Sequence, residues 1–485
     1  MIIAILLISP VALALFVVLT PRVRPTFAAL LLAALVQALC VVLLVGSPES
    51  LTAYFRADAL SLLFLGLLSI VLVATSIYLV GQFARSVPRD HSRHFATFAA
   101  FFLLFVDSMN GAILTTHLGL FWVFLEASTL TSVVLVNFDG TRRSLEAAWK
   151  YVFICSIGIS LAFIGIVLLG IADLSNRSLF FTDLYRAAPS MSPFWLKMAF
   201  AFVLIGFGTK MGLAPVHSWL PDAHSEGPAP ISALLSGALL NVALLGILRV
   251  DRILNAGGSG RFASSLLLTM GFLSLFVSAV FILGSTNYKR MLAYSSIEHM
   301  GIISIGFGAG GIGIFAALFH MVGHSLSKSA FFLTSGNLHD LAESNEISAV
   351  RSLLRRDRIT AALVLAAFLA VSAVPPFSTF VSEVLLVWAL IKRSALLVVL
   401  FLLLLVVILY GMGDRAVEIA FRTGAEEVEG SHQDGRTPRS PGHLSLWAYL
   451  PQVLLLALAA LFGVYLPGRI DSMLHSAAAL LGGGA

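Results

Sequence analysis

Residues 319–332 read FHMVGHSLSKSAFF, and they lie inside an apolar segment that extends from 310 to 338. About 20 apolar residues are enough to cross the hydrocarbon core of a bilayer, about 30 Å at 1.5 Å per residue. His320, His324 and Lys328 interrupt the segment at a spacing of four, so on a helix their side chains share one face over about 12 Å. The stretch predicts a transmembrane helix with one titratable stripe.

The composition extends this prediction to the whole chain. Of its 485 residues, 59% are hydrophobic and 11% are charged, whereas soluble domains have about 45–50% apolar and about 25% charged residues. A water-soluble protein is excluded. About 14 apolar segments predict an all-α polytopic membrane protein with about 14 transmembrane helices. The segments run approximately over residues 2–20, 26–46, 57–81, 95–110, 112–137, 150–172, 195–220, 228–249, 262–284, 288–309, 310–338, 360–391, 394–414 and 446–467. DSMNG, at 107–111, is the expected break between the fourth and fifth segments.

The basic residues predict the orientation, because Lys and Arg gather in cytoplasmic loops. The loops after odd-numbered segments hold 18 of them, against 10 in the loops after even-numbered segments and in the C-terminal tail. We therefore expect the odd-numbered loops in the cytoplasm and both termini on the outer side. The two of the 30 basic residues that these loops do not account for, Lys210 and Lys328, fall inside apolar segments.

The two cysteines, Cys40 and Cys155, each lie inside an apolar segment. They cannot supply a disulfide framework, a cysteine-ligated metal site or an iron–sulfur cluster from this chain alone. We therefore expect no cofactor or metal in this chain and redox cofactors on partner subunits. The first 20 residues have no basic residue before the apolar run and no clear A-x-A site, so they predict a first span rather than a cleaved signal peptide.

Ionisable residues inside apolar segments mark the candidate functional site. A charge at the bilayer centre costs about 2.5–3.5 kcal/mol, so such residues usually line a water path or pair with one another. Glu126, Glu298 and Glu383 accompany the two lysines, and with the histidine stripe they predict a chain of protonatable sites. Two other interpretations of the stripe stay open. It could make hydrogen bonds between helices, or its histidines could bind zinc, although no local carboxylate or cysteine accompanies them.

Two apolar segments contain helix breakers near an ionisable residue. Those around Lys210 are Gly206, Gly208, Gly212, Pro215 and Pro221, and those before Glu383 are Pro375 and Pro376. A broken helix is tolerated at membrane depth only where protein or a water-filled cavity satisfies the freed backbone groups. Two such segments, five spans apart, predict two inverted five-helix repeats with discontinuous helices 7 and 12.

The predicted organisation has five parts. They are a three-helix segment at 1–94, a first repeat at 95–250, a second repeat at 251–422, a polar cytoplasmic loop at 423–445 and a last helix with its tail at 446–485. The stretch 423–443 is rich in Gly, Pro and charge, which is typical of a solvated linker. A docking site for a partner is the alternative.

Five motifs resemble those of the antiporter-like subunits shared by respiratory complex I, the Mrp sodium/proton antiporters and the group 4 NiFe hydrogenases. They are FWVFLEASTLTS (121–132), TKMGLAPVHSWLPDAHSEGPAP with its continuation (from 209), NYKRMLAYSSIEHMGIISIG (287–306), FHMVGHSLSKSAFFLTSG (319–336) and AVPPFSTFVSE (373–383). The form SSIEHMG is most similar to hydrogenase-4 component F. The resemblance implies a 14-helix fold with two inverted five-helix repeats. It also argues against the distal complex I subunit, since the chain has no long lateral helix after residue 467.

The resemblance also implies roles for individual residues. Glu126 and Lys210 correspond to a charged pair, Lys328 to the central lysine with His320 and His324 as connecting histidines, and Glu383 to the terminal site. Asn241 stands where some relatives have a bridging lysine, so the step between Lys210 and Lys328 is expected to use water, Ser236 or His224. Glu298 is a secondary member of the path.

The expected function is that of a proton-translocating subunit in a multi-subunit redox complex of the prokaryotic inner membrane, of the hydrogenase-4 or complex I type. Its expected partners are membrane and peripheral subunits, with no nucleic acid. A sodium/proton antiporter subunit of the Mrp type is the alternative, and a structural membrane anchor is a third possibility.

Overall fold

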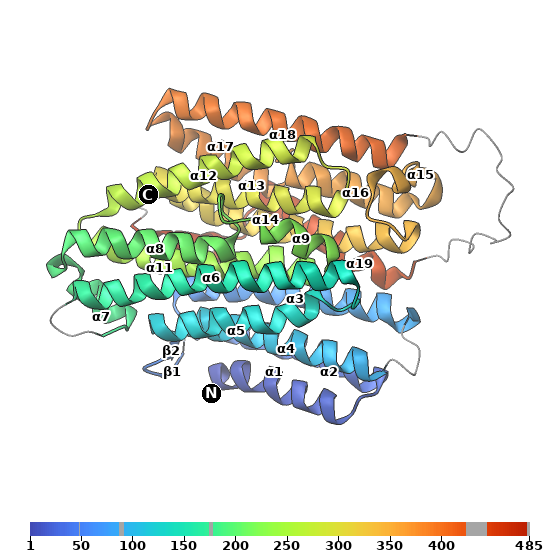
Figure 1. The fold of residues 1–485 in the computed structure, drawn as a ribbon, viewed down its shortest axis with the longest axis horizontal. Helices are drawn as coiled ribbons and strands as arrows, with labels where there is room; N and C mark the ends of the chain where they lie inside the picture. Colours follow the sequence, from blue (N-terminus) through green and yellow to red (C-terminus); the bar gives the residue numbers. More distant parts are fainter. Residues whose placement is uncertain (48, 87–91, 174–177, 423–443, 483–485) are drawn as a thin grey trace, which may run out of the picture.

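The structure, a computed structural model, describes residues 1–47, 49–86, 92–173, 178–422 and 444–482. Most of its long helices run side by side along one direction, with α1 and α2 at one edge of the molecule and α18 at the opposite edge (Figure 1). The strands β1 (Ser50–Thr52) and β2 (Phe55–Arg56) form a short antiparallel hairpin. The fold is therefore all-α in its membrane part, as the composition predicts.

The first part of the chain forms the helices α1 (Ile2–Leu19), α2 (Val23–Gly46), α3 (Ala59–Ser86), α4 (Ser92–Leu114), α5 (Leu118–Val136), α6 (Arg142–Ala172), α7 (Phe181–Ala187), α8 (Pro193–Met211), α9 (Trp219–Glu226), α10 (Ala229–Leu234) and α11 (Leu240–Ala256). A π-helical turn, η3 (Leu235–Leu239), joins α10 to α11, so that Ala229–Ala256 is one span.

The second part forms α12 (Gly260–Leu283), α13 (Tyr288–Ala309), α14 (Ile312–Ala342), α15 (Leu353–Arg356), α16 (Arg358–Val371), α17 (Ser378–Ile391), α18 (Ala395–Phe421), α19 (Leu450–Val464) and α20 (Gly468–Leu480). The short 3-10 turns are η2 (Ala188–Ser190), η4 (Ile347–Val350) and η6 (Leu446–Ala448).

Every predicted apolar segment corresponds to one helix or to consecutive helices of this series. In the described part of the chain, ten helices are long and apolar enough to cross a membrane, or eleven if the bent pair α19 and α20 is one span. The polytopic membrane fold is thus confirmed, whereas the count of 14 stays a prediction. Of the predicted polar loop at 423–445, residues 423–443 lie outside the described residues.

The predicted break at DSMNG is wrong. Helix α4 continues through these residues, and the chain turns only at 115–117. Inside the helix, Asn110 exchanges two hydrogen bonds of 2.8 and 2.9 Å with the side chain of Gln37 on α2. Because the polar amide has its partner within the bundle, it does not interrupt the helix.

Both predicted helix breaks are confirmed. The first separates α8 from α9, where Gly212 adopts a left-handed φ of 82° and the Trp219 indole donates to the Thr209 carbonyl at 2.7 Å. The second separates α16 from α17, where the Thr379 hydroxyl donates to the Ala370 carbonyl at 2.6 Å. In each case a side chain beyond the break satisfies a carbonyl before it, as burial in a membrane requires.

Ion pairs show which helix ends lie together. Arg249, within α11, donates to both carboxylate oxygens of Asp58, directly before the start of α3, at 2.5 and 2.9 Å. At another place, Lys150 and Arg290 both bind Asp222. Lys150 and Arg290 belong to odd-numbered loops of the predicted topology, so the structure brings two such loops to the same end of the bundle.

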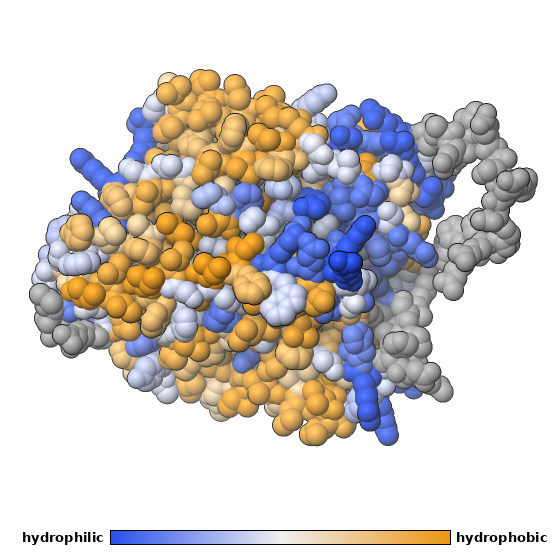
Figure 2. All heavy atoms as spheres, in the orientation of Figure 1, coloured by the Kyte–Doolittle hydropathy of each residue, from blue (hydrophilic) through white to orange (hydrophobic). Residues whose placement is uncertain are grey.

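Hydrophobic and polar residues divide the surface accordingly. In the view of Figure 2, orange apolar residues cover much of the flanks, and blue hydrophilic residues gather toward the end of the bundle where α15 lies. Helices α7 and α20 and the β1–β2 hairpin were not predicted, because each is too short or too polar to appear as an apolar segment. Helix α20 turns away from α19 by 77°.

Gly463 on α19 positions the second break. A β-carbon at this residue would lie 2.0 Å from the Pro376 carbonyl oxygen and 2.7 Å from the Ser378 nitrogen, both backbone atoms of the α16–α17 connection. We expect Gly463→Ala to lower the free energy of unfolding by about 1–3 kcal/mol, since the backbone must shift to make room. Denaturant titration in detergent measures this change.

Gly170→Ala on α6 is the matched control, because nothing lies within 4 Å of its added β-carbon. This change is expected to leave stability equal or to raise it by up to about 1 kcal/mol. Equal effects of the two substitutions would contradict the close approach of α19 to the break.

Candidate functional site

Lys210 lies fully buried in the last turn of α8, directly before the first break. Its ammonium donates to the Thr129 hydroxyl at 2.7 Å and to the Tyr151 hydroxyl at 2.8 Å. Tyr151 also contacts the Ser132 hydroxyl at 2.7 Å. A buried lysine is thus held by neutral hydroxyl groups from α5 and α6.

Glu126 lies one turn before Thr129 on α5 and is half-buried. It accepts hydrogen bonds from Ser156 on α6 at 2.8 Å and from Thr129 at 3.3 Å. Among the contacts of the described residues, Glu126 and Lys210 are joined through the Thr129 hydroxyl. The structure brings the two predicted residues into one cluster, and the hydroxyl stands where the resemblance implies a direct pair.

The π-helical turn η3 packs against α14. Its Gly237 has no room for a side chain, because a β-carbon there would lie 2.1 Å from the Ser329 hydroxyl of α14. Ser236 contacts the Ser296 hydroxyl at 2.9 Å. One turn farther, Asn241 donates to Ser325 at 2.8 Å. Such π-helical insertions occur frequently at functional sites.

His299 on α13 was not singled out by the sequence analysis. It forms a line of three histidines with His320 and His324 of α14. Its Nδ1 lies 2.8 Å from His320 Nε2, and its ring centroid lies 5.1 Å from that of His324. His324 Nε2 lies 3.2 Å from the Ser236 carbonyl oxygen. His299 stands inside an apolar segment like the other two histidines, so the same criterion would have found it, but its partners lie 21 and 25 positions away on another helix.

Further residues that the sequence analysis singled out lie on α13, α14 and α17. His320 Nδ1 is 2.9 Å from the Ser382 hydroxyl, and Ser382 directly precedes the half-buried Glu383. Lys328 is fully buried and donates to the Leu292 carbonyl at 3.1 Å. Glu298 is buried near it and accepts from Ser295 at 2.9 Å. The predicted residues Glu298, His320, Lys328 and Glu383 thus lie on three helices, α13, α14 and α17, that pack against one another.

His224 on α9 has a different environment. It is fully buried and its ring stacks on Phe332 of α14 at a centroid distance of 4.5 Å. Neither of its ring nitrogens has a hydrogen-bond partner among the described residues, and the same holds for His324 Nδ1 and Asn241 Oδ1. Buried polar atoms without a protein partner are the places where ordered water is held. In the described part of the chain, no group of three or more His, Cys, Asp or Glu side chains could hold a metal ion.

A polar cavity opens at one end of this arrangement. Its volume is about 300 Å³, and its lining residues include Arg143, Glu146, Lys150, Asp222, Glu226 and Arg290. Asp222 on α9 binds Lys150 of α6 at 3.1 Å and Arg290 of α13 at 2.8 Å. The cavity therefore lies where the half-helix after the first break meets two spans, and two cations hold that half-helix in place.

The fold and the site define a class. It is that of polytopic α-helical membrane proteins in which two broken spans accompany buried and half-buried lysines, glutamates and histidines, here on α5, α8, α9, α13, α14 and α17.

Comparison with known proteins specifies the family. Residues 115–409 match the model of the family described as NADH:quinone oxidoreductase/Mrp antiporter, TM. The chain is 35% identical over 439 residues to the hydrogenase-4 component F homolog of Methylacidiphilum infernorum, covering 88% of this chain and 89% of that one. It therefore belongs to the NADH:quinone oxidoreductase/Mrp antiporter family of membrane proteins.

Two further similarities bear on the fold and length. The chain is 31% identical over 342 residues to hydrogenase-4 component B of Escherichia coli, covering 68% of this chain and only 49% of that longer protein. A chain in the structure of the membrane-bound sulfane sulfur reductase, an archaeal respiratory membrane complex, superimposes with a TM-score of 0.86 at 22% identity, covering 99% of this chain and 98% of the other. The shared fold thus covers 99% of this chain.

The two cations at Asp222 allow a direct test of the cavity. We expect Asp222→Asn to lower the melting temperature by about 1–3 °C at low salt and by less in 1 M NaCl, because salt screens the wild-type ion pairs. Differential scanning fluorimetry in detergent measures both values. Glu343→Gln, at an exposed residue after α14, removes the same charge and is the control. An Asp222→Asn effect that does not depend on salt would contradict the ion-pair account.

Proposed function

We propose that this protein moves protons across the membrane as one subunit of a multi-subunit redox complex of the hydrogenase-4 type. The single observation that carries the proposal is the buried sequence of contacts His299–His320–Ser382, next to Glu383, inside a bundle that also buries Lys210 and Lys328. Imidazole both accepts and donates protons through its two nitrogens, and a line of such groups is suited to a relay.

The input part of the proposed path is Glu126 and Lys210. The Thr129 hydroxyl accepts from the ammonium of Lys210 and donates to Glu126, so it couples the two charges through one rotatable group. A charge change at Glu126 alters how strongly the protonated lysine is stabilised. In the proposed mechanism, Lys210 then holds or releases its proton according to the charge beside it.

The central part connects Lys210 to Lys328 and the histidines. Asn241 supplies an amide at the position where, by the resemblance, some relatives have a bridging lysine. Its side chain donates to Ser325 on α14. Ser236 contacts Ser296, and its carbonyl faces His324. Together with the unpartnered ring nitrogens of His224, these groups support a hydrated step between the two lysines. Glu383 is the proposed exit group.

The surroundings of the subunit complete the proposal. The positive-inside count supports a position of the Asp222 cavity on the cytoplasmic side of a prokaryotic inner membrane, with both termini outside. The relatives are named as components of hydrogenase-4, so further membrane and peripheral subunits are the proposed partners. Those partners would carry the redox cofactors, and this subunit would respond to them electrostatically.

A sodium/proton antiporter subunit of the Mrp type is the second candidate, because the family description includes the Mrp antiporters. The central contacts join the imidazole nitrogens of His299 and His320 to a single serine hydroxyl, whereas hard cations prefer several oxygen ligands. This chemistry favours protons.

The lysines provide the main test. We expect Lys210→Ala and Lys328→Ala to slow proton uptake by about ten- to a hundredfold, the effect of losing one buried charged hydrogen bond of about 1.5–3 kcal/mol. Uptake is measured in liposomes containing the whole complex with a pH-sensitive dye, and sodium flux with ²²Na⁺ alongside it.

Lys197→Ala changes an exposed lysine on the same helix, α8, and is expected to behave as wild type. Normal uptake by a correctly assembled Lys210 or Lys328 variant would refute the relay. If sodium flux alone followed the substitutions, the transported ion would be Na⁺ and the second candidate would hold.

His299 provides a second test, which is independent of the lysines. We expect His299→Gln to slow uptake by about tenfold or more while assembly persists, because glutamine can donate a hydrogen bond but cannot take up and release a proton. The control is His339→Gln, at an exposed histidine near the end of α14. Wild-type uptake in the His299 variant would remove this residue from the path.

A further inference from the structure

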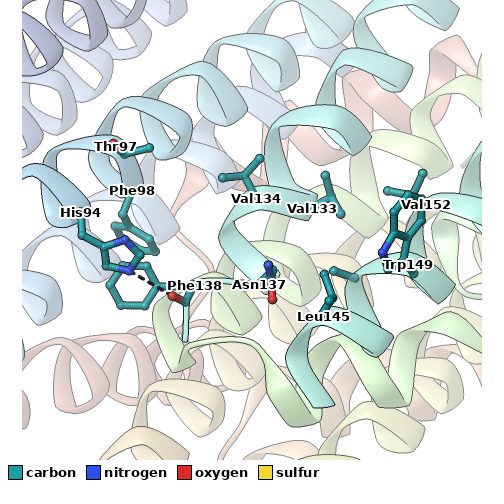
Figure 3. Close-up of a pocket in the computed structure, with 11 residues that line it drawn as sticks. His94, Thr97, Phe98, Val133, Val134, Asn137, Phe138, Leu145, Trp149 and Val152 are labelled. Carbon is teal, nitrogen blue, oxygen red and sulfur yellow. Dashed lines mark hydrogen bonds between the residues drawn. The ribbon is translucent and has the colours of Figure 1, made fainter. Parts of the chain in front are cut away.

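A cavity of about 560 Å³ lies between α4, α5 and α6, away from the titratable path. Its lining is mostly apolar, with Val133, Val134, Phe138, Leu145, Trp149 and Val152 among the residues that form it. Figure 3 shows His94 and Phe138 on one side of it and Leu145 and Trp149 on the other. The volume is within the range of about 300–1,000 Å³ that is usual for small-molecule sites.

The cavity opens to the side of the bundle. Leu145 and Trp149 are 47% and 56% exposed, and Val134 on the facing helix is 39% exposed. These side chains would be in contact with lipid in a membrane. Trp149 also stands seven residues after the start of α6, and tryptophan is enriched where membrane helices meet the lipid headgroups.

One end of the cavity is polar and basic. His94 and Asn137 line it there, and His94 Nε2 bonds the Phe138 carbonyl at 3.0 Å. Arg142 precedes Leu145 by three residues and Trp149 by seven, so it lies on the cavity face of α6, one turn beyond the lining. Arg93 precedes Thr97 by four residues on α4 and lies on the same face as this lining residue.

The charges at this end favour an anion. Arg93 and Arg142 are exposed near it, and the exposed Asp139 is the acid of the loop between α5 and α6. Glu146 is engaged by Lys150 at 2.8 Å. Among the described residues at this end the net charge is therefore positive, while the interior is apolar. Basic pockets between membrane helices on the cytoplasmic side are suited to anionic lipid headgroups.

We propose that this cavity binds a phospholipid with an anionic headgroup from the cytoplasmic leaflet. One acyl chain lies between α5 and α6 against Val134 and Trp149, and the phosphate lies at the arginine rim with His94 and Asn137. The leaflet rests on the orientation given under Proposed function, whereas the binding itself does not depend on proton transport.

The test uses the purified complex in nanodiscs of phosphatidylcholine. Trace phosphatidylglycerol carrying a diazirine in one acyl chain is added, irradiated and mapped to peptides, and the same experiment is done with a diazirine phosphatidylcholine. We expect phosphatidylglycerol to label peptides of α4, α5 and α6 at least fivefold more than phosphatidylcholine does, since only the anionic headgroup pairs with the rim.

Two variants separate the parts of the site. Val134→Trp fills the cavity and is expected to abolish the labelling. Leu130→Trp, at an exposed position one turn away on α5 that does not line the cavity, is expected to leave the labelling unchanged.

The double change Arg93→Gln and Arg142→Gln is expected to make labelling by phosphatidylglycerol equal to labelling by phosphatidylcholine. Arg261→Gln, an exposed arginine at the opposite helix ends, is its control.

Several results would overturn the proposal. They are equal labelling by the two lipids in the wild type, labelling spread evenly over the lipid-facing helices, and cross-linking of these residues to a partner subunit's helix in place of lipid. Each of them leaves proton uptake to be measured separately, so a failure here does not bear on the relay.

Discussion

The packing of the helices in this protein depends on the free-energy cost of removing charged side chains from water. Lys210, Lys328 and Glu298 are each almost completely inaccessible to solvent, and in a bilayer such groups persist only beside polar partners. The partners come from hydroxyl groups, carbonyls and imidazoles on neighbouring helices, so the helices must approach closely and in a fixed register. The two breaks and the π-helical turn lie where this requirement is strictest, since each of them aims backbone or side-chain polar groups at the buried residues.

Much of the fold was accessible from the sequence because a membrane imposes a strong and simple rule. A helix that crosses it must be apolar for about 20 residues, and that signal survives without any knowledge of tertiary contacts. The rule failed at DSMNG, where Asn110 looked like a break and is in fact satisfied by Gln37, 73 positions earlier. It also missed α20, whose burial depends on what it packs against.

The candidate site was predictable in its residues and less so in its contacts. Intramembrane lysines, glutamates and the i, i+4, i+8 stripe could be read directly from the spacing. That Thr129 stands between Glu126 and Lys210, or that His299 meets His320, depends on how α5 faces α8 and how α13 faces α14. Hydroxyl residues are common in membrane helices, so nothing in the sequence distinguishes Thr129 from its neighbours. The roles of these residues in transport remain predictions.

Helix α14 carries the stripe, and it is enclosed on every side. From Gly313 to Leu338 nearly all of its residues are buried, and it packs against α3, α10, α13, α16, α17 and α19. A helix surrounded in this way cannot tilt or slide without unpacking most of its neighbours. The stripe is therefore fixed in position, and in the proposed relay a change of access between the two sides of the membrane would have to come from side-chain rotation and hydration at its ends.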